Sequence, residues 1–172
     1  MPPKLGDKCK MKILVSDKIS QRGLDVLDAA KERGLEYDVK TGLSAEKLRA
    51  VIPEYEGLIV RSSTEVTAYV LDAAANLKIV GRAGIGVDNV DVEAASKHGI
   101  IVMNTPDSNA ITTAEHAIAM MMALSRNIPQ ATASMRGGQW EKNRFTGVEL
   151  MGKTIGVVGL GRIGSLVVKR AI

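Results

Sequence analysis

Short apolar runs alternate with helix-like segments along residues 11–106, and this alternation constrains the fold more than any other feature of the chain. Most of the runs are rich in leucine, valine and isoleucine, and each has the length of a strand. They lie at 12–16, 36–39, 57–60, 77–80 and 100–103. Helices are expected between them, at 20–31, 44–51, 67–75 and 92–97. Such alternation predicts an α/β fold, with a parallel sheet covered on both faces through right-handed crossovers.

Composition and charge exclude several classes of function. The 23 basic and 19 acidic residues are interspersed, and one Trp, three Tyr and one Phe are too few for a nucleic-acid stacking surface. No apolar run is long enough to span a bilayer, and residues 1–10 resemble a flexible extension rather than a secretory signal. The single cysteine, Cys9, excludes an internal disulfide and fits a reducing cytoplasm.

A second domain is expected to begin after a boundary near Asp107. A helix is predicted from about 109 to 125, and its run 117–124 is apolar on all sides, which is typical of a buried helix or a subunit interface. Residues 127–150 are polar and contain glycines, so they are not assigned a regular element.

Residues 154–164 have the pattern of a buried strand that runs into a Gly-x-Gly-x-x-Gly turn. In a dinucleotide site, Gly159 permits the tight turn, Gly161 lets the backbone approach a pyrophosphate, and Gly164 lets the next helix pack closely. The pyrophosphate would lie at the helix N-terminus. A turn without a ligand also needs glycine, but the flanking strand and helix patterns favour the dinucleotide site. The acidic residue that binds the ribose is expected about 20 positions further on, beyond Ile172.

Two loops follow neighbouring predicted strands, at the edge where sheets of this kind bind ligands. Residues 61–64, Arg-Ser-Ser-Thr, place a guanidinium beside three hydroxyls, a combination suited to a carboxylate or phosphate. Residues 81–86 contain three glycines, which let backbone N–H groups converge on an anion, and Arg82 adds charge. A simpler interpretation is that Ser or Thr in the first loop, and Asp88 or Asn89 after the second, cap the following helices. The position of both loops at one edge favours a shared cleft for an anionic ligand.

The two histidines do not predict a catalytic or metal site. His98 lies at a predicted helix end, where a cation suits the helix dipole, and His116 lies in the first turn of the apolar helix. A structural role is expected for both. No metal-ligand spacing and no paired-carboxylate motif is present in the sequence.

Three motifs in order resemble those of the D-isomer-specific 2-hydroxyacid dehydrogenases. They are Gly-Arg-Ala-Gly-Ile-Gly-Val-Asp-Asn-Val-Asp at 81–91, Val-Met-Asn-Thr-Pro at 102–106 and Gly-Leu-Gly-Arg-Ile-Gly at 159–164. The resemblance covers essentially all of residues 11–172. Residues 128–135 and Trp140-Glu141 are most similar to members of this family that oxidise 3-phosphoglycerate.

The resemblance implies a flavodoxin-like substrate-binding domain over 11–107 and the beginning of a Rossmann NAD-binding domain over 108–172. It also implies a homodimer or larger oligomer formed through the 109–125 helix. The residues that it assigns to the carboxylate and phosphate of the small-molecule substrate are Arg61, Ser62, Arg82, Gly84 and Asn109. Those that it assigns to NAD are Ile85, Gly159, Gly161, Arg162, Ile163 and Gly164. Many relatives carry threonine or a small residue in place of Ile85, so only a van der Waals contact is expected there.

The implied reaction is the NAD-dependent oxidation of 3-phospho-D-glycerate to 3-phosphooxypyruvate, in L-serine biosynthesis. A histidine serves as acid and base, a glutamate orients it and an arginine binds the substrate carboxylate. The resemblance implies that these three residues lie after Ile172, so the 172-residue polypeptide is expected to be inactive alone. Neither His98 nor His116 matches the motif of the catalytic histidine, and that role is assigned to neither. Alternatives are another D-2-hydroxyacid dehydrogenase, a non-catalytic dinucleotide-sensing protein of the same fold, or a short product that pairs with full-length subunits.

Overall fold

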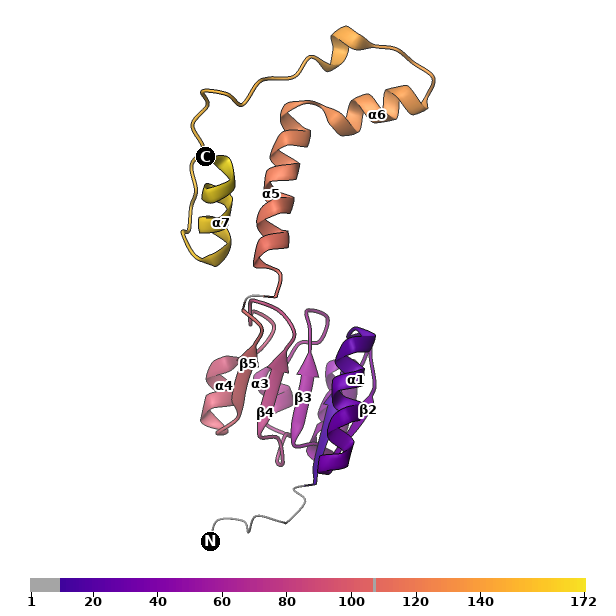
Figure 1. Cartoon of the computed structure of the whole chain (residues 1–172). Helices are drawn as coiled ribbons and strands as arrows, with labels where there is room; N and C mark the ends of the chain where they lie inside the picture. Colours follow the sequence, from indigo (N-terminus) through magenta and orange to yellow (C-terminus); the bar gives the residue numbers. More distant parts are fainter. Residues whose placement is uncertain (1–9, 107) are drawn as a thin grey trace. The chain divides into compact units, whose positions relative to one another are not determined.

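The computed structural model describes residues 10–106 and 108–172, which form two compact units (Figure 1). The first unit ends at Ser108, and the second spans Asn109–Ile172. The expectations for residues 1–9, including Cys9, and for the boundary residue Asp107 lie outside the described residues.

The first unit is built on a five-stranded parallel sheet with the strand order β2-β1-β3-β4-β5. The strands are β1 Met11–Val15, β2 Leu35–Val39, β3 Gly57–Val60, β4 Ile79–Arg82 and β5 Ile101–Asn104. This order is the flavodoxin-like variant of the doubly wound fold. The predicted fold class and the five predicted strands are therefore confirmed, with ends that differ by one or two residues.

Four α-helices connect these strands. They are α1 Gln21–Ala30, α2 Ala45–Val51, α3 Ala68–Leu71 and α4 Val92–Lys97. The Ser44 hydroxyl caps α2 by accepting the Lys47 N–H at 3.4 Å, and Gly34 lies at φ 93° where the chain leaves the helical region. Helix α3 is shorter than the predicted 67–75, because the Ala73 and Ala74 N–H groups bond to carbonyls three residues earlier and tighten the chain into turns.

Crossover direction decides which face of the sheet each helix covers. The chain steps from β1 to β2 in one direction and makes its three later crossovers in the other, so right-handed connections place α1 alone on one face. Figure 1 shows α1 in front of the sheet and α3 behind it. The main core lies on the side of α2, α3 and α4. Its fully buried side chains include Leu14, Leu48, Ile52, Tyr55, Leu58, Val60, Val66, Val70, Leu71 and Val80.

The α1 face of the sheet is covered less completely. Side chains alternate along a strand, so Leu58 and Val60 face the core while Ile59 between them faces α1. Toward β5 this face is open, since Ile101 is 61% and Met103 54% exposed. The second face of the parallel sheet therefore presents apolar side chains to solvent.

The second unit contains helices α5 Ala110–Ser125, α6 Ile128–Arg136 and α7 Arg162–Ala171, and a 3-10 turn at Lys142–Phe145. Helices α5 and α7 pack together, and Arg170 Nη2 lies 2.9 Å from Glu115 Oε1. The sequence did not predict α6, whose limits are nevertheless ordinary ones, with a proline in its first turn and Gly137 at its end.

One prediction for the second unit is wrong, and one of the two explanations of the apolar run 117–124 does not apply. Residues 154–158 form no strand, and Val158 is fully exposed; among the described residues of this unit there is no strand that could supply ladder partners. The run 117–124 is not buried within this chain, since Met120 is 58% and Leu124 76% exposed. The subunit interface named as the other explanation of that run stays a prediction.

Candidate functional site

The candidate site forms where the strand order reverses. Strands β1 and β3 are neighbours, but the chain leaves β1 toward α1 on one face and leaves β3 toward α3 on the other. Ligands of doubly wound folds bind beyond the carboxyl ends of the strands at such a point. Asp17 follows β1 there, and the loop 61–64 follows β3.

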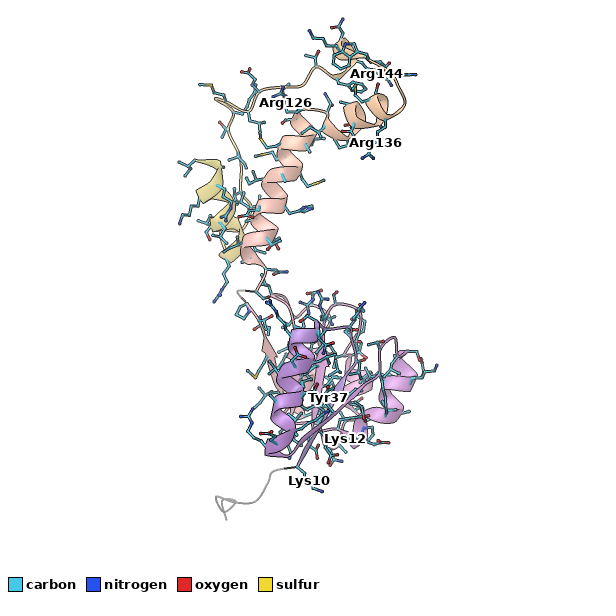
Figure 2. All side chains as sticks on the ribbon, turned by 45° about the vertical axis from the view of Figure 1, so that its right-hand side comes forward. Lys10, Lys12, Tyr37, Arg126, Arg136 and Arg144 are labelled. Carbon is cyan, nitrogen blue, oxygen red and sulfur yellow. The ribbon has the colours of Figure 1, made fainter. Side chains whose placement is uncertain are left out.

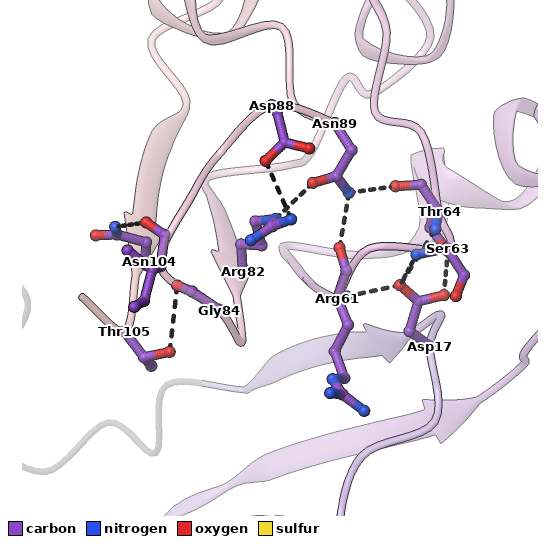
Figure 3. A network of polar contacts seen from close by, with 11 residues as sticks. Asp17, Arg61, Ser63, Thr64, Arg82, Gly84, Asp88, Asn89, Asn104 and Thr105 are labelled. Carbon is purple, nitrogen blue, oxygen red and sulfur yellow. Dashed lines mark hydrogen bonds and ion pairs between the residues drawn. The ribbon is translucent and has the colours of Figure 1, made fainter. Parts of the chain in front are cut away.

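Asp17 organises this loop, as Figure 3 shows. Its Oδ2 accepts the backbone N–H groups of Arg61 at 2.6 Å and of Ser63 and Thr64 at 3.2 Å each. Its Oδ1 accepts the Thr64 hydroxyl at 2.7 Å. Burial opposes ionisation of Asp17, but the four hydrogen bonds outweigh it and hold the pKa below its ordinary value of 3.8. The carboxylate therefore stays charged while only 5% of the residue is exposed.

Asn89 binds the same loop from its carbonyl side. Its Nδ2 donates to the carbonyl oxygens of Arg61 at 2.7 Å and Thr64 at 2.6 Å, and its Oδ1 accepts Nε of Arg82 at 2.5 Å (Figure 3). The alternative in which Asp88 or Asn89 caps α4 is wrong, because Asp91 is the cap and its side chain accepts the Ala94 N–H at 2.9 Å. Thr64 does not cap α3 either, since its hydroxyl is bonded to Asp17.

Arg82 is nearly buried at the end of β4. Besides Asn89 it meets Asp88, whose Oδ1 lies 3.2 Å from Nη2. Its third nitrogen, Nη1, lies against Gly84, where an added Cβ would come within 2.5 Å of it. Gly84 thus leaves room for the guanidinium. Gly81, in contrast, belongs to β4 itself and not to the loop.

The loop after β4 is fastened from β5. Asn104 Nδ2 donates to the Ile85 carbonyl at 2.6 Å, and the Thr105 N–H donates to the Gly84 carbonyl at 2.9 Å. The Ile85 side chain is half-buried and is apolar, so van der Waals contact is what it can offer.

The structure brings Arg61, Ser62, Arg82, Gly84 and Ile85 to one edge of the sheet, but the two arginines are directed differently. Figure 3 shows the Arg61 side chain pointing away from Arg82. Its Nη1 lies 3.5 Å from the Lys18 carbonyl, beside an open hollow of about 550 Å³ between α1 and Ile59. Ser62 is exposed, and neither its N–H nor its hydroxyl bonds to another described residue. The sequence did not identify Asp17; its signal is an acidic residue directly after the first strand.

The other predicted residues belong to the second unit. Asn109 is the cap residue of α5, and its carbonyl accepts the Thr113 N–H. In the glycine turn Gly159 has φ 94°, which favours glycine, and Gly161 precedes α7, whose first two residues are Arg162 and Ile163. A Cβ on Gly164 would collide with the Gly159 carbonyl oxygen, whereas one on Gly161 would meet no atom within 4 Å.

Other kinds of site lack support in the described residues. No three His, Cys, Asp or Glu side chains among them are grouped as metal ligands. No helix in the described ranges has both the length and the apolarity needed to cross a membrane. Figure 2 shows Lys10, Lys12 and Tyr37, which line a hollow beside β1 and β2. There Lys12 pairs with Asp38 at 3.3 Å and with Glu54 at 3.5 Å, so its charge is matched.

The sequence matches a family model, the catalytic domain of D-isomer specific 2-hydroxyacid dehydrogenases, over residues 13–157. The chain belongs to this family. Its members are oxidoreductases, and its curated relatives include a D-3-phosphoglycerate dehydrogenase from Archaeoglobus fulgidus, 54% identical over 160 residues. That match covers 93% of this chain but 30% of the relative, so the chain spans less than a third of the relative's length.

Solved structures of the family resemble the fold. An NAD-dependent formate dehydrogenase from Staphylococcus aureus, solved with NAD, has a TM-score of 0.82 and 30% identity over 93% of this chain and 53% of its own. An NADPH-dependent glyoxylate/hydroxypyruvate reductase from Sinorhizobium meliloti has a TM-score of 0.79 and 32% identity over 94% of this chain and 50% of its own.

Proposed function

We propose that the chain provides the substrate-binding domain, residues 11–107, and the start of the NAD-binding domain, residues 108–172, of a D-3-phosphoglycerate dehydrogenase. The observation that carries the proposal is the 54% identity to the Archaeoglobus protein of that name. The parent reaction would be oxidation of 3-phospho-D-glycerate to 3-phosphooxypyruvate in L-serine biosynthesis, in the cytoplasm. The 109–125 helix would contribute to a homodimer or larger oligomer.

The edge of the sheet suits an acidic substrate. The Arg61 side chain is exposed, and among the described residues its guanidinium bonds only to the Lys18 carbonyl, at 3.5 Å, so it is available to a carboxylate or phosphate. Ser62 offers an N–H and a hydroxyl, and Arg82 offers Nη1 beside Gly84. In the proposal these residues hold the substrate anion, and Asn109 adds an amide.

The glycine turn suits a dinucleotide pyrophosphate. A side chain at Gly161 would occupy space that is now empty, so a ligand can approach the backbone there. The N-terminus of α7 follows, at Arg162 and Ile163, where N–H groups and the helix dipole favour phosphate. Bound NAD would supply the nicotinamide that accepts the hydride. This chain's own part is to bind and orient, with Ile85 making apolar contact, because none of its described residues is assigned as the acid or base.

An NMR titration of the isotope-labelled 172-residue chain tests the proposal. We expect 3-phospho-D-glycerate to shift the amide signals of residues 61–64 and 84–86, and NAD to shift those of 159–164. D-Glycerate and D-lactate lack the phosphate and should bind more weakly. Equal shifts with all three acids would favour another D-2-hydroxyacid as substrate, and NAD binding without any acid would favour the dinucleotide-sensing alternative. No shift with any ligand would contradict the proposal.

A further inference from the structure

The loop 61–64 is held by two buried side chains that the proposed substrate would not touch. Asp17 takes three of its four backbone N–H groups, and Asn89 takes the carbonyls at its two ends. Both residues are 5% exposed. The N–H that Asp17 leaves out is that of Ser62, a residue proposed to meet the substrate.

The same network reaches the arginine at the end of β4. Asn89 Oδ1 accepts the Nε of Arg82, which directs the guanidinium of a different strand. One amide side chain therefore links the loop after β3 to the arginine that ends β4. If the loop moved, Asn89 would lose its carbonyl partners and Arg82 its orientation.

We infer that Asp17 and Asn89 are positioning residues that preorganise Ser62 and Arg82 for an anionic substrate. Free N–H groups on a short loop would otherwise adopt many arrangements, and fixing them in advance lowers the entropy cost of binding. Asp17 accepts the other three N–H groups of the loop, so that of Ser62 is left for the ligand. The inference rests on the proposed function for the identity of the ligand.

Two near-isosteric substitutions test it in the 172-residue chain. Asp17→Asn removes the charge that gathers the N–H groups, and Asn89→Asp removes both donors to the loop carbonyls while keeping an acceptor for Arg82. Asp91→Asn is the matched control, because it exchanges one good helix cap for another on the same unit. Circular dichroism melting curves of the unaltered chain and the three variants give the temperature below which all four are folded. The measurements are made below that temperature.

The first measurement, amide hydrogen exchange, needs no ligand. We expect the Arg61, Ser63 and Thr64 amides to exchange at least about tenfold faster in Asp17→Asn, since each loses an interaction with a buried charge. The control should not change them. Unchanged exchange in Asp17→Asn would overturn the inference whatever the ligand is.

The second measurement is the Kd for 3-phospho-D-glycerate from the amide shifts. We expect it to rise about tenfold in both variants. Asp17→Asn weakens hydrogen bonds to a charged group, and Asn89→Asp removes two hydrogen bonds to the loop carbonyls, and either loss costs about that much. If Asp17 and Asn89 serve only stability, the variants would have lower melting temperatures and an unchanged Kd. That result would overturn this inference but not the proposed function. Absence of binding by the unaltered chain would overturn the proposed function, and the positioning role with it.

Discussion

The α-carbon of Gly164 lies so close to the carbonyl oxygen of Gly159 that no side chain fits between them. The first residue of the glycine turn and the last are thus in contact across it, and Gly159 adopts φ 94°. The turn therefore requires glycine at both of these positions. At Gly161, which lies between them, a side chain would meet no other atom within 4 Å.

Gly164→Ala should consequently affect stability, whereas Gly161→Ala should affect binding of NAD. We expect Gly164→Ala to destabilise the turn and α7 by about 1–3 kcal/mol, because the added methyl must displace backbone. Gly161→Ala should leave stability nearly unchanged and weaken binding of NAD. Amide exchange in α7 and NAD-induced shifts measure the two effects, and similar destabilisation by both changes would contradict this assignment.

Gly84→Ala should weaken binding of 3-phospho-D-glycerate with little loss of stability. Its methyl would meet the flexible end of Arg82, which can move, so the guanidinium would be displaced while the strand survives. Gly81→Ala is the control, because a Cβ there meets no atom within 4 Å. Titrations of both variants, with melting curves, check this; weaker binding in the Gly81 variant as well would show that the effect is not specific to Arg82.

The contribution of Asp17 to stability should depend on pH. Its folded pKa lies below the unfolded value of 3.8, so the stabilisation is complete above that value and is lost as the pH falls through the folded pKa. We expect Asp17→Asn to cost about 2 kcal/mol at neutral pH. Urea unfolding of both proteins over a pH series should show the difference narrowing below pH 3.8. A difference in the free energy of unfolding that stays constant down to the lowest pH would show that the charge of Asp17 does not contribute to stability.

The 172-residue polypeptide alone should not oxidise 3-phospho-D-glycerate with NAD. Among the described residues of the first unit, the only histidine is His98, which lies at the end of α4 and pairs with Asp72. From there the chain enters β5 at the amino edge of the sheet, opposite the proposed substrate edge. The proposed substrate edge therefore has no histidine from that unit. NADH formation followed by absorbance tests this, and steady turnover by the purified polypeptide would show that acid and base both lie within it.

The strands of the first unit could be predicted because their signals are local. Each apolar run is short and bounded by polar or glycine residues. The handedness of the crossovers then fixes the face on which each helix packs, once the strand order is known. The same reasoning failed at 154–158, which has the composition of a strand. A strand also needs a neighbour for its backbone groups, and composition does not reveal whether one is present.

The role of Asn89 could not be read from the sequence. Asp88, Asn89 and Asp91 are all good capping residues by type, and they stand within four positions of one another. Only the distant carbonyls of Arg61 and Thr64 decide that Asn89 turns inward and that Asp91 caps the helix. Asp17 escaped prediction for the same reason, since its partners lie more than 40 residues away.

The unequal cover of the two faces of the sheet has a consequence for how the first unit tolerates change. Three helices pack on one face of the sheet, where Leu58 and Val80 are almost completely inaccessible, so truncations there remove contacts on all sides. On the α1 face, Ile101 and Met103 already touch solvent, and changes to them should cost far less within this chain. Neighbouring residues of one strand, such as Val102 and Met103, therefore differ in mutational tolerance, alternating with the pleat.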